Sequence, residues 1–197
     1  MKILVVLAHP NSKSFNHAIA ETSVSVLKQM GHEVIFHDLH KENFDPMVPA
    51  AEIPDNALIP DDIDAYCQEL ATAAGIIIIH PNWWGQPPAI LKGWVDRVFR
   101  SGVAYEFLEG DSGEGVPHGL LQAKAALVFN TSNTSAEREE NSFGDPLERI
   151  WKDCIFDLCG VTAFYRKMFR IVITSTEAER KQWLEEVKEA VRHHFLG

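Results

Sequence analysis

The chain reads Gly75-Ile76-Ile77-Ile78-Ile79-His80-Pro81-Asn82-Trp83-Trp84-Gly85 and continues Gln86-Pro87-Pro88-Ala89-Ile90-Leu91-Lys92-Gly93-Trp94. The isoleucine run predicts a buried strand, because β-branched residues without polar alternation favour a strand that is covered on both faces. An aromatic turn and a helix over 89–99 follow the strand. In a parallel sheet a ligand crevice opens at such a point, and the two adjacent indoles favour a flat, electron-rich ligand there.

Short apolar runs alternate with helical patterns along the rest of the chain. Strands are predicted over 2–8, 32–38, 76–79, 124–130 and 161–173, and helices over 14–30, 61–73, 89–99, 146–159 and from Thr176 onward. Thr176 and Glu179 have the spacing of a capping box. This alternation predicts a single domain over 1–197, a flavodoxin-like three-layer α/β/α sandwich whose five-stranded parallel sheet has the order 2-1-3-4-5.

Two segments interrupt the alternation. The segment 43–60 carries prolines at 46, 49, 54 and 60, which indicates an ordered excursion or a mobile loop rather than a linker between domains. The segment 110–119 contains four glycines and several acidic residues, and it is typical of a flexible surface loop.

Composition excludes several classes of function. The formal net charge of -10 argues against nonspecific binding of nucleic acid, because that affinity needs a basic surface. Cys67, Cys154 and Cys159 have no CxxC spacing, so neither a disulfide framework nor a metal site is indicated, and a reducing cytoplasm fits. The first apolar run ends at His9-Pro10, too early for a signal peptide, and no run reaches the roughly 18 residues of a membrane span.

Three polar or aromatic loops follow predicted strands. Residues 9–16 lead into a helix N-terminus, where free backbone N–H groups, Ser12, Ser14 and Lys13 favour a phosphate, although an N-cap turn without a ligand explains them equally well. The phosphate-binding patterns GxxxxGK[ST] and GxGxxG are both missing, which disfavours nucleotide hydrolysis and the usual dinucleotide fingerprint.

The second loop, 81–85, offers indole faces and a glycine, and the third, 130–134, offers hydroxyl and amide groups. Taken alone, the indoles fit a hydrophobic core and the polar residues fit a solvated turn. Loops after the first, third and fourth strands of this topology nevertheless surround the switch point of the sheet, where a phosphate-bearing flat ligand binds. Their convergence indicates a flavin site.

The chain also carries a series of longer motifs, in order: Leu7-Ala8-His9, Ser14-Phe15-Asn16, Asp38-Leu39, Asn43-Phe44-Asp45-Pro46, Pro88-Ala89-Ile90-Leu91-Lys92-Gly93-Trp94, Asp96-Arg97-Val98-Phe99, Ala104-Tyr105, Phe143-Gly144-Asp145, Cys159-Gly160 and Ala178-Glu179-Arg180. These stretches span nearly the whole chain. They resemble the NAD(P)H:quinone oxidoreductase family of flavodoxin-like flavoproteins, which includes bacterial ancillary subunits of potassium efflux systems.

The resemblance implies a tightly held flavin and a homodimer whose interface forms the active sites. The residues that it places on the phosphates are His9, Ser14, Phe15 and Asn16, and those along the isoalloxazine ring are Pro81, Asn82, Trp84 and Gly85. Trp83, the other indole of this loop, is a further cofactor-binding candidate. Those at the polar edge of the ring are Asn130, Thr131, Ser132 and Asn133. Arg180 matches an arginine that meets the adenine of the family's flavin, which favours FAD over FMN.

The substrate pocket of the family is walled by aromatic residues from across the dimer, and Tyr105 and Phe107 match those positions, with Trp84 as a third pocket residue. A tyrosine and a histidine that assist charge on the reduced flavin in the best-known members are replaced by Glu137 and Phe143. His118, in the glycine-rich loop, is interpreted as a solvated surface histidine.

Together these features predict an NAD(P)H dehydrogenase (quinone)-like enzyme. A hydride passes from NAD(P)H through flavin N5 to a quinone or similar acceptor in a ping-pong cycle, and no side chain is assigned to the chemical step. Two alternatives stay open: a redox-sensing regulatory subunit of a membrane ion-efflux system, docked through the loop 110–119, and a one-electron carrier of the flavodoxin type.

Overall fold

A five-stranded parallel sheet forms the centre of the protein. The computed structural model describes residues 1–54, 57–108, 110 and 114–196. The strands are β1 (Lys2–Leu7), β2 (Glu33–Asp38), β3 (Gly75–Pro81), β6 (Ala126–Ser132) and β7 (Phe164–Arg170), in the order β2-β1-β3-β6-β7. Adjacent strands all pair in parallel. The predicted fold class and the strand order 2-1-3-4-5 are therefore confirmed.

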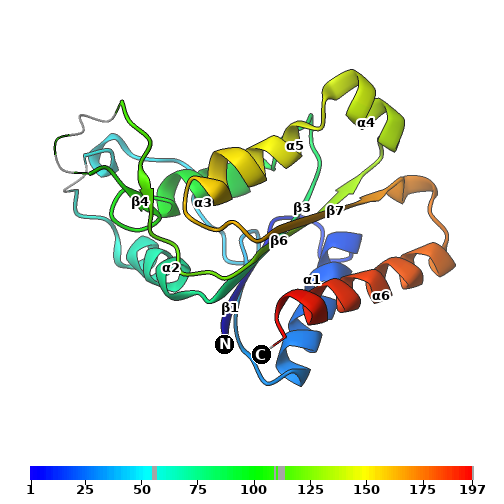
Figure 1. The fold of residues 1–197 in the computed structure, drawn as a ribbon. Helices are drawn as coiled ribbons and strands as arrows, with labels where there is room; N and C mark the ends of the chain where they lie inside the picture. Colours follow the sequence, from blue (N-terminus) through cyan, green and yellow to red (C-terminus); the bar gives the residue numbers. More distant parts are fainter. Residues whose placement is uncertain (55–56, 109, 111–113, 197) are drawn as a thin grey trace.

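Helices cover both faces of this sheet (Figure 1). On one face, Ile77 and Ile79 of β3 pack with α1 (Phe15–Gln29) and α6 (Glu177–His194). On the other, Ile76 and Ile78 pack with α2 (Asp61–Thr72), α3 (Ala89–Val98), α5 (Pro146–Arg149) and the π-helical η2 (Ile150–Asp157). Every residue of β3 is buried, as the unbroken isoleucine run predicts for a strand between two helical layers.

The two helices that cover one face of the sheet, α1 and α6, both begin with side-chain caps. The Ser14 hydroxyl accepts a hydrogen bond from the N–H of His17 at the start of α1. At the start of α6, Thr176 and Glu179 form the predicted capping box, each accepting from the other's backbone N–H.

Several predicted boundaries are wrong. The strand predicted over 124–130 is β6, which begins at Ala126 and extends to Ser132, so Thr131 and Ser132 belong to the strand rather than to a loop. The helix predicted over 146–159 is two elements, α5 and η2, and the strand predicted over 161–173 is the shorter β7 followed by the 3-10 turn η3 (Val172–Thr174). Helix α4 (Ala136–Phe143) was not predicted, because its sequence AEREENSF has no apolar stripe.

The segment 43–53 is an ordered excursion that packs on α3. A Cβ atom on Gly93 would lie 2.2 Å from the carbonyl oxygen of Pro46, so only glycine lets the two backbones approach this closely. Arg97 donates from Nε and Nη2 to the carboxylate of Glu52, which lies in the 3-10 turn η1 (Ala50–Glu52). Residues 55–56 lie outside the described part of the chain.

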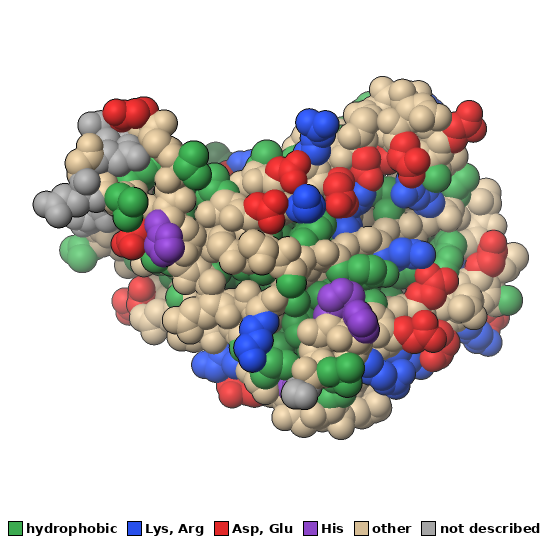
Figure 2. Space-filling view, viewed as in Figure 1, with side chains coloured by type: hydrophobic (Ala, Val, Ile, Leu, Met, Phe, Trp, Pro, Cys, Tyr) green, Lys and Arg blue, Asp and Glu red, His purple; other side chains and the backbone are tan. Residues whose placement is uncertain are grey.

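The predicted flexible loop 110–119 is described only in part, since residues 111–113 lie outside the described residues. Its last two residues form β5 (His118–Gly119), which pairs antiparallel with β4 (Tyr105–Glu106). Figure 2 shows acidic side chains gathered over α5 and its neighbours, with Lys and Arg scattered among them. None of the described helices is both long and apolar enough to span a bilayer.

Candidate functional site

A cavity of about 410 Å³ lies at the carboxyl edge of the sheet, beside the N-terminus of α1. All three predicted loops contribute to it, together with the segment that follows β7. Its lining residues are His9, Asn11, Ser14, Phe15, Asn16, Pro81, Asn82, Trp83, Thr131, Ser132, Asn133, Thr134, Val172 and Ile173. The convergence predicted from the topology is therefore present in the structure.

The first loop presents hydrogen-bond donors to the cavity. The Ser14 hydroxyl caps the N–H of His17, which leaves the N–H groups of Phe15 and Asn16 without partners inside the helix. The positive end of the α1 dipole points to the same place. Burial lowers the pKa of His9, whose Nδ1 accepts from the N–H of Asn11, so the ring is neutral and its other nitrogen is a donor.

Asn16 joins the first loop to the third. Its side chain is buried, and its Nδ2 donates to the Thr131 hydroxyl at 2.8 Å. Its Oδ1 is buried without a hydrogen-bond partner although the residue lines the cavity. A buried, unpaired amide oxygen costs about 1–3 kcal/mol, and a ligand with an N–H or O–H donor would remove that cost.

The second loop is a tight turn that holds the indoles outward. Trp83 and Gln86 exchange both backbone hydrogen bonds, and Trp84 and Gly85 between them have positive φ of 57° and 72°. The Asn82 side-chain oxygen accepts from the N–H of Gly85 at 2.9 Å and braces the turn. Trp84 is fully exposed and Trp83 is about half exposed, so neither indole belongs to the core.

The third loop contributes Thr131, Ser132 and Asn133 to the cavity, whereas Asn130 is not among the residues that line it. The Asn130 side chain is buried and points away from the cavity, where Nδ2 donates to His80 and Oδ1 accepts from Arg166. The reason is the pleat of β6, because adjacent strand residues point to opposite faces.

His80 organises a buried polar network beneath the site. Its Nε2 accepts from both Asn130 Nδ2 and Trp151 Nε1 at 2.8 Å, so the ring proton is on Nδ1, which donates to the Pro81 carbonyl at 2.9 Å. Complete burial lowers the pKa of His80 to about 4. The neutral ring ties the ends of β3 and β6 to η2.

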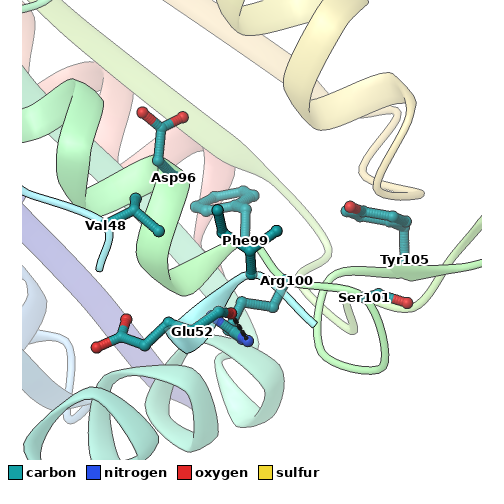
Figure 3. A pocket seen from close by; sticks show the side chains of 8 residues that line it. Val48, Glu52, Asp96, Phe99, Arg100, Ser101 and Tyr105 are labelled. Atoms are coloured by element: carbon teal, nitrogen blue, oxygen red, sulfur yellow. Dashed lines mark hydrogen bonds between the residues drawn. The ribbon is translucent and has the colours of Figure 1, made fainter. Parts of the chain in front are cut away.

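Arg180, Tyr105 and Phe107 do not line this cavity. Arg180 donates to the Ser175 hydroxyl and to the carbonyls of Val172 and Ser175, so it braces the turn between β7 and α6. Tyr105 lines a smaller cavity of about 220 Å³ against α3 and η1, and Figure 3 shows its ring apart from the Glu52–Arg100 contact. Within one chain these three predicted residues are therefore not brought to the 410 Å³ cavity.

A second cavity of about 540 Å³ adjoins the first, and the two share Asn82 and Thr134. The other residues that line it are Trp84, Gly85, Arg138, Glu139, Phe143 and Pro146. Glu139 in this second cavity, and Val172 and Ile173 in the first, were not predicted from the sequence. The topology could have pointed to Val172 and Ile173, because the carboxyl end of β7 meets the same edge of the sheet.

The comparisons with known proteins agree with this geometry. A family model described as flavodoxin-like fold matches residues 1–195. An uncharacterized NAD(P)H oxidoreductase of Haemophilus influenzae is 32% identical over 189 residues, 94% of this chain and 91% of that protein. The human ribosyldihydronicotinamide dehydrogenase [quinone] is 31% identical over 205 residues, 91% of this chain and 86% of that protein.

A crystal structure of a Streptococcus mutans protein superposes with a TM-score of 0.85 at 30% identity, covering 98% of this chain and all of the other. The chain belongs to the flavodoxin-like family. With relatives of this similarity named as oxidoreductases, it is an oxidoreductase.

The buried histidine makes the stability of the fold depend on pH. Because the folded pKa of His80 is about 4 against about 6.5 when unfolded, the unfolded chain binds the proton more tightly, and stability falls as the pH drops from about 6.5 to about 4. We expect wild type to lose about 2 to 3 kcal/mol more than His80→Gln between about pH 7 and about pH 4.5, measured by urea unfolding.

His118→Gln is the matched control, because His118 is an exposed histidine on β5, and its pH profile should follow wild type. Parallel profiles for wild type and His80→Gln would contradict the buried, neutral assignment of His80.

Proposed function

We propose that the protein is a flavin-dependent NAD(P)H oxidoreductase that passes two electrons to a quinone or similar acceptor. The observation that supports it best is the cavity at the N-terminus of α1, which the segments that follow β1, β3 and β6 line together. The names of the two relatives agree, one as an NAD(P)H oxidoreductase and one as a ribosyldihydronicotinamide dehydrogenase [quinone].

The residues at the α1 end of the cavity fit the phosphate of a flavin. The N–H groups of Phe15 and Asn16, the Ser14 hydroxyl and the neutral His9 ring are all donors, and the helix dipole adds positive potential. No carboxylate is among the residues that line this cavity in the described chain. An anion therefore gains hydrogen bonds there without repulsion from a neighbouring acid.

The other end of the cavity fits a planar ring. On one side of the cavity, the turn after β3 places backbone and the Trp83 indole along the wall. On the other side, Thr131 to Thr134 present hydroxyl and amide groups to the ligand. A bound flavin supplies the two-electron chemistry. The residues of this chain hold and orient it, donate hydrogen bonds to its polar edge and exclude water with the indoles.

We propose FAD as the flavin, with FMN as the alternative. Arg180, the residue whose match favours FAD, donates to Ser175 and to the carbonyl of Val172, which lines the cavity. Mass measurement of the ligand released from the purified protein distinguishes the two flavins. We propose also that the protein acts in the cytoplasm.

Asn16→Asp tests the phosphate site. It replaces an amide by a carboxylate of the same shape at the helix N-terminus, so repulsion of the phosphate should lower flavin affinity by on the order of a hundredfold. We expect purified wild-type protein to be yellow and the variant to lose its visible absorption on dialysis. Gln29→Glu makes the same chemical change at the exposed far end of α1 and should retain the flavin.

Steady-state kinetics test the shared pocket. If NAD(P)H leaves before the quinone binds, double-reciprocal plots against NAD(P)H at several quinone concentrations should be parallel. Intersecting lines would contradict a ping-pong cycle. Negligible quinone turnover by the yellow protein would favour the regulatory-subunit or one-electron-carrier alternatives.

We propose also that the protein is a homodimer. Trp84 is fully exposed, so its indole leaves a large apolar surface in water. It also has a positive φ, a conformation that costs a bulky residue on the order of 1 kcal/mol. Apolar contacts with a partner that covers the indole would offset both costs. Tyr105 and Phe107, which do not reach the cavity of their own chain, are then available to the partner's site.

Sedimentation equilibrium should give twice the monomer mass for wild type. Trp84→Asp should weaken the dimer at least tenfold, because it removes an aromatic contact and buries a charge. Val116→Asp, at an exposed residue outside both cavities, is the control. A monomeric wild type would rule the homodimer out.

A further inference from the structure

Glu139 is a buried carboxylate whose hydrogen bonding is incomplete. It lies on α4, its side chain is 1% exposed, and it lines the 540 Å³ cavity. Its Oε1 accepts from Asn82 Nδ2 at 3.1 Å. Its Oε2 is buried and has no hydrogen-bond partner.

An incompletely bonded carboxylate is costly at such a place. Buried charges in proteins are normally paired or fully hydrogen-bonded, and Glu139 has one neutral donor and no salt bridge among the described residues. A ligand that donates an N–H or O–H to Oε2 would complete the shell. The same ligand cannot place an anion there, because two carboxylates would then face one another.

The rest of the cavity restricts the shape of the ligand. The indole of Trp84 and the ring of Phe143 provide apolar walls, and the Arg138 guanidinium lies 5.2 Å from the Phe143 ring centroid. Arg138 makes no salt bridge in the described part of the chain. The residues that line the cavity therefore include two aromatic rings, one unpaired hydrogen-bond acceptor and one cationic donor.

A primary carboxamide on a planar ring matches this pair, with its NH₂ toward Glu139 and its carbonyl toward Arg138. We propose that Glu139 is a specificity-determining residue that accepts a hydrogen bond from the carboxamide of the nicotinamide ring. This inference rests on the proposed function in that NAD(P)H is the reductant. Glu139 has no part in hydride transfer itself, and its effect is on which ring is held.

The consequence is selection of nicotinamide against nicotinate, which differs only in carrying a carboxylate. The carboxylate of nicotinate would be repelled by Glu139, whose carboxyl group is buried. It would be attracted to Arg138, but that side chain is exposed, and exposed ion pairs contribute little to binding. Repulsion should therefore dominate. Wild type should bind nicotinamide more tightly than nicotinate by on the order of ten- to a hundredfold.

The test compares the dissociation constants of nicotinamide and nicotinate, read from quenching of tryptophan fluorescence as each ligand is titrated into the protein as purified. Glu139→Gln keeps an acceptor for Asn82 and turns an NH₂ toward the ligand, so the preference should fall at least tenfold. Glu140→Gln removes the same charge from the next, exposed residue of α4 and should keep the wild-type preference.

A second readout uses the wild-type protein and Glu139→Gln in the reductive half-reaction. Bleaching of the flavin absorption by 1-methyl-1,4-dihydronicotinamide should be faster than by 1-methyl-1,4-dihydronicotinate in wild type, and the ratio should collapse in the variant.

Equal affinities of wild type for nicotinamide and nicotinate would overturn the inference even if Glu139→Gln failed to fold. A variant that loses flavin while its ligand preference is unchanged would also overturn it, and would assign Oε2 to a donor of the cofactor instead. A colourless wild type would contradict the proposed function alone, because the fluorescence titration does not need the flavin.

Discussion

The structure depends on burying β3 on both of its faces. A strand with helices on either side cannot leave its backbone groups to water, so it must have a partner strand at each edge, here β1 and β6. The parallel pairing then brings the carboxyl ends of three strands to one line. The segments that follow these three strands therefore lie next to one another at this edge of the sheet, and the cavity lies between them.

The polar network around His80 fixes how those ends meet. His80 accepts one hydrogen bond from Asn130 of β6 and one from Trp151 of η2. It donates to the carbonyl of Pro81, the first residue of the tryptophan-containing loop 81–85. Arg166 continues the network from Asn130 to Glu148 and Asp145. A buried network with all these partners resists rotation of any one of them, so the floor of the site is rigid while the indoles above it are exposed.

The fold and the first cavity could be predicted from the sequence because they follow from periodicity. The isoleucine run, the capping residues Ser14 and Thr176 and the alternation of strands and helices are local signals that tertiary packing does not oppose. The direction of the Asn130 side chain could not be predicted in the same way, because it depends on β6 continuing in a regular pleat beyond residue 130, where a loop was expected to begin.

Helix α4 escaped prediction for a different reason, and this reason bears on its role. Its sequence is almost wholly polar, and Glu139, the buried residue of this helix, accepts a hydrogen bond from Asn82. A helix with an apolar stripe is held by the core. Helix α4 is instead tied to the loop 81–85 by a hydrogen bond that the Asn82 amide donates to the Glu139 carboxylate. The residue that secures this helix is thus the same one that faces the second cavity. Because Asn82 also braces the turn at Gly85, a ligand bound to Glu139 would act on the position of the helix and on the indole loop together.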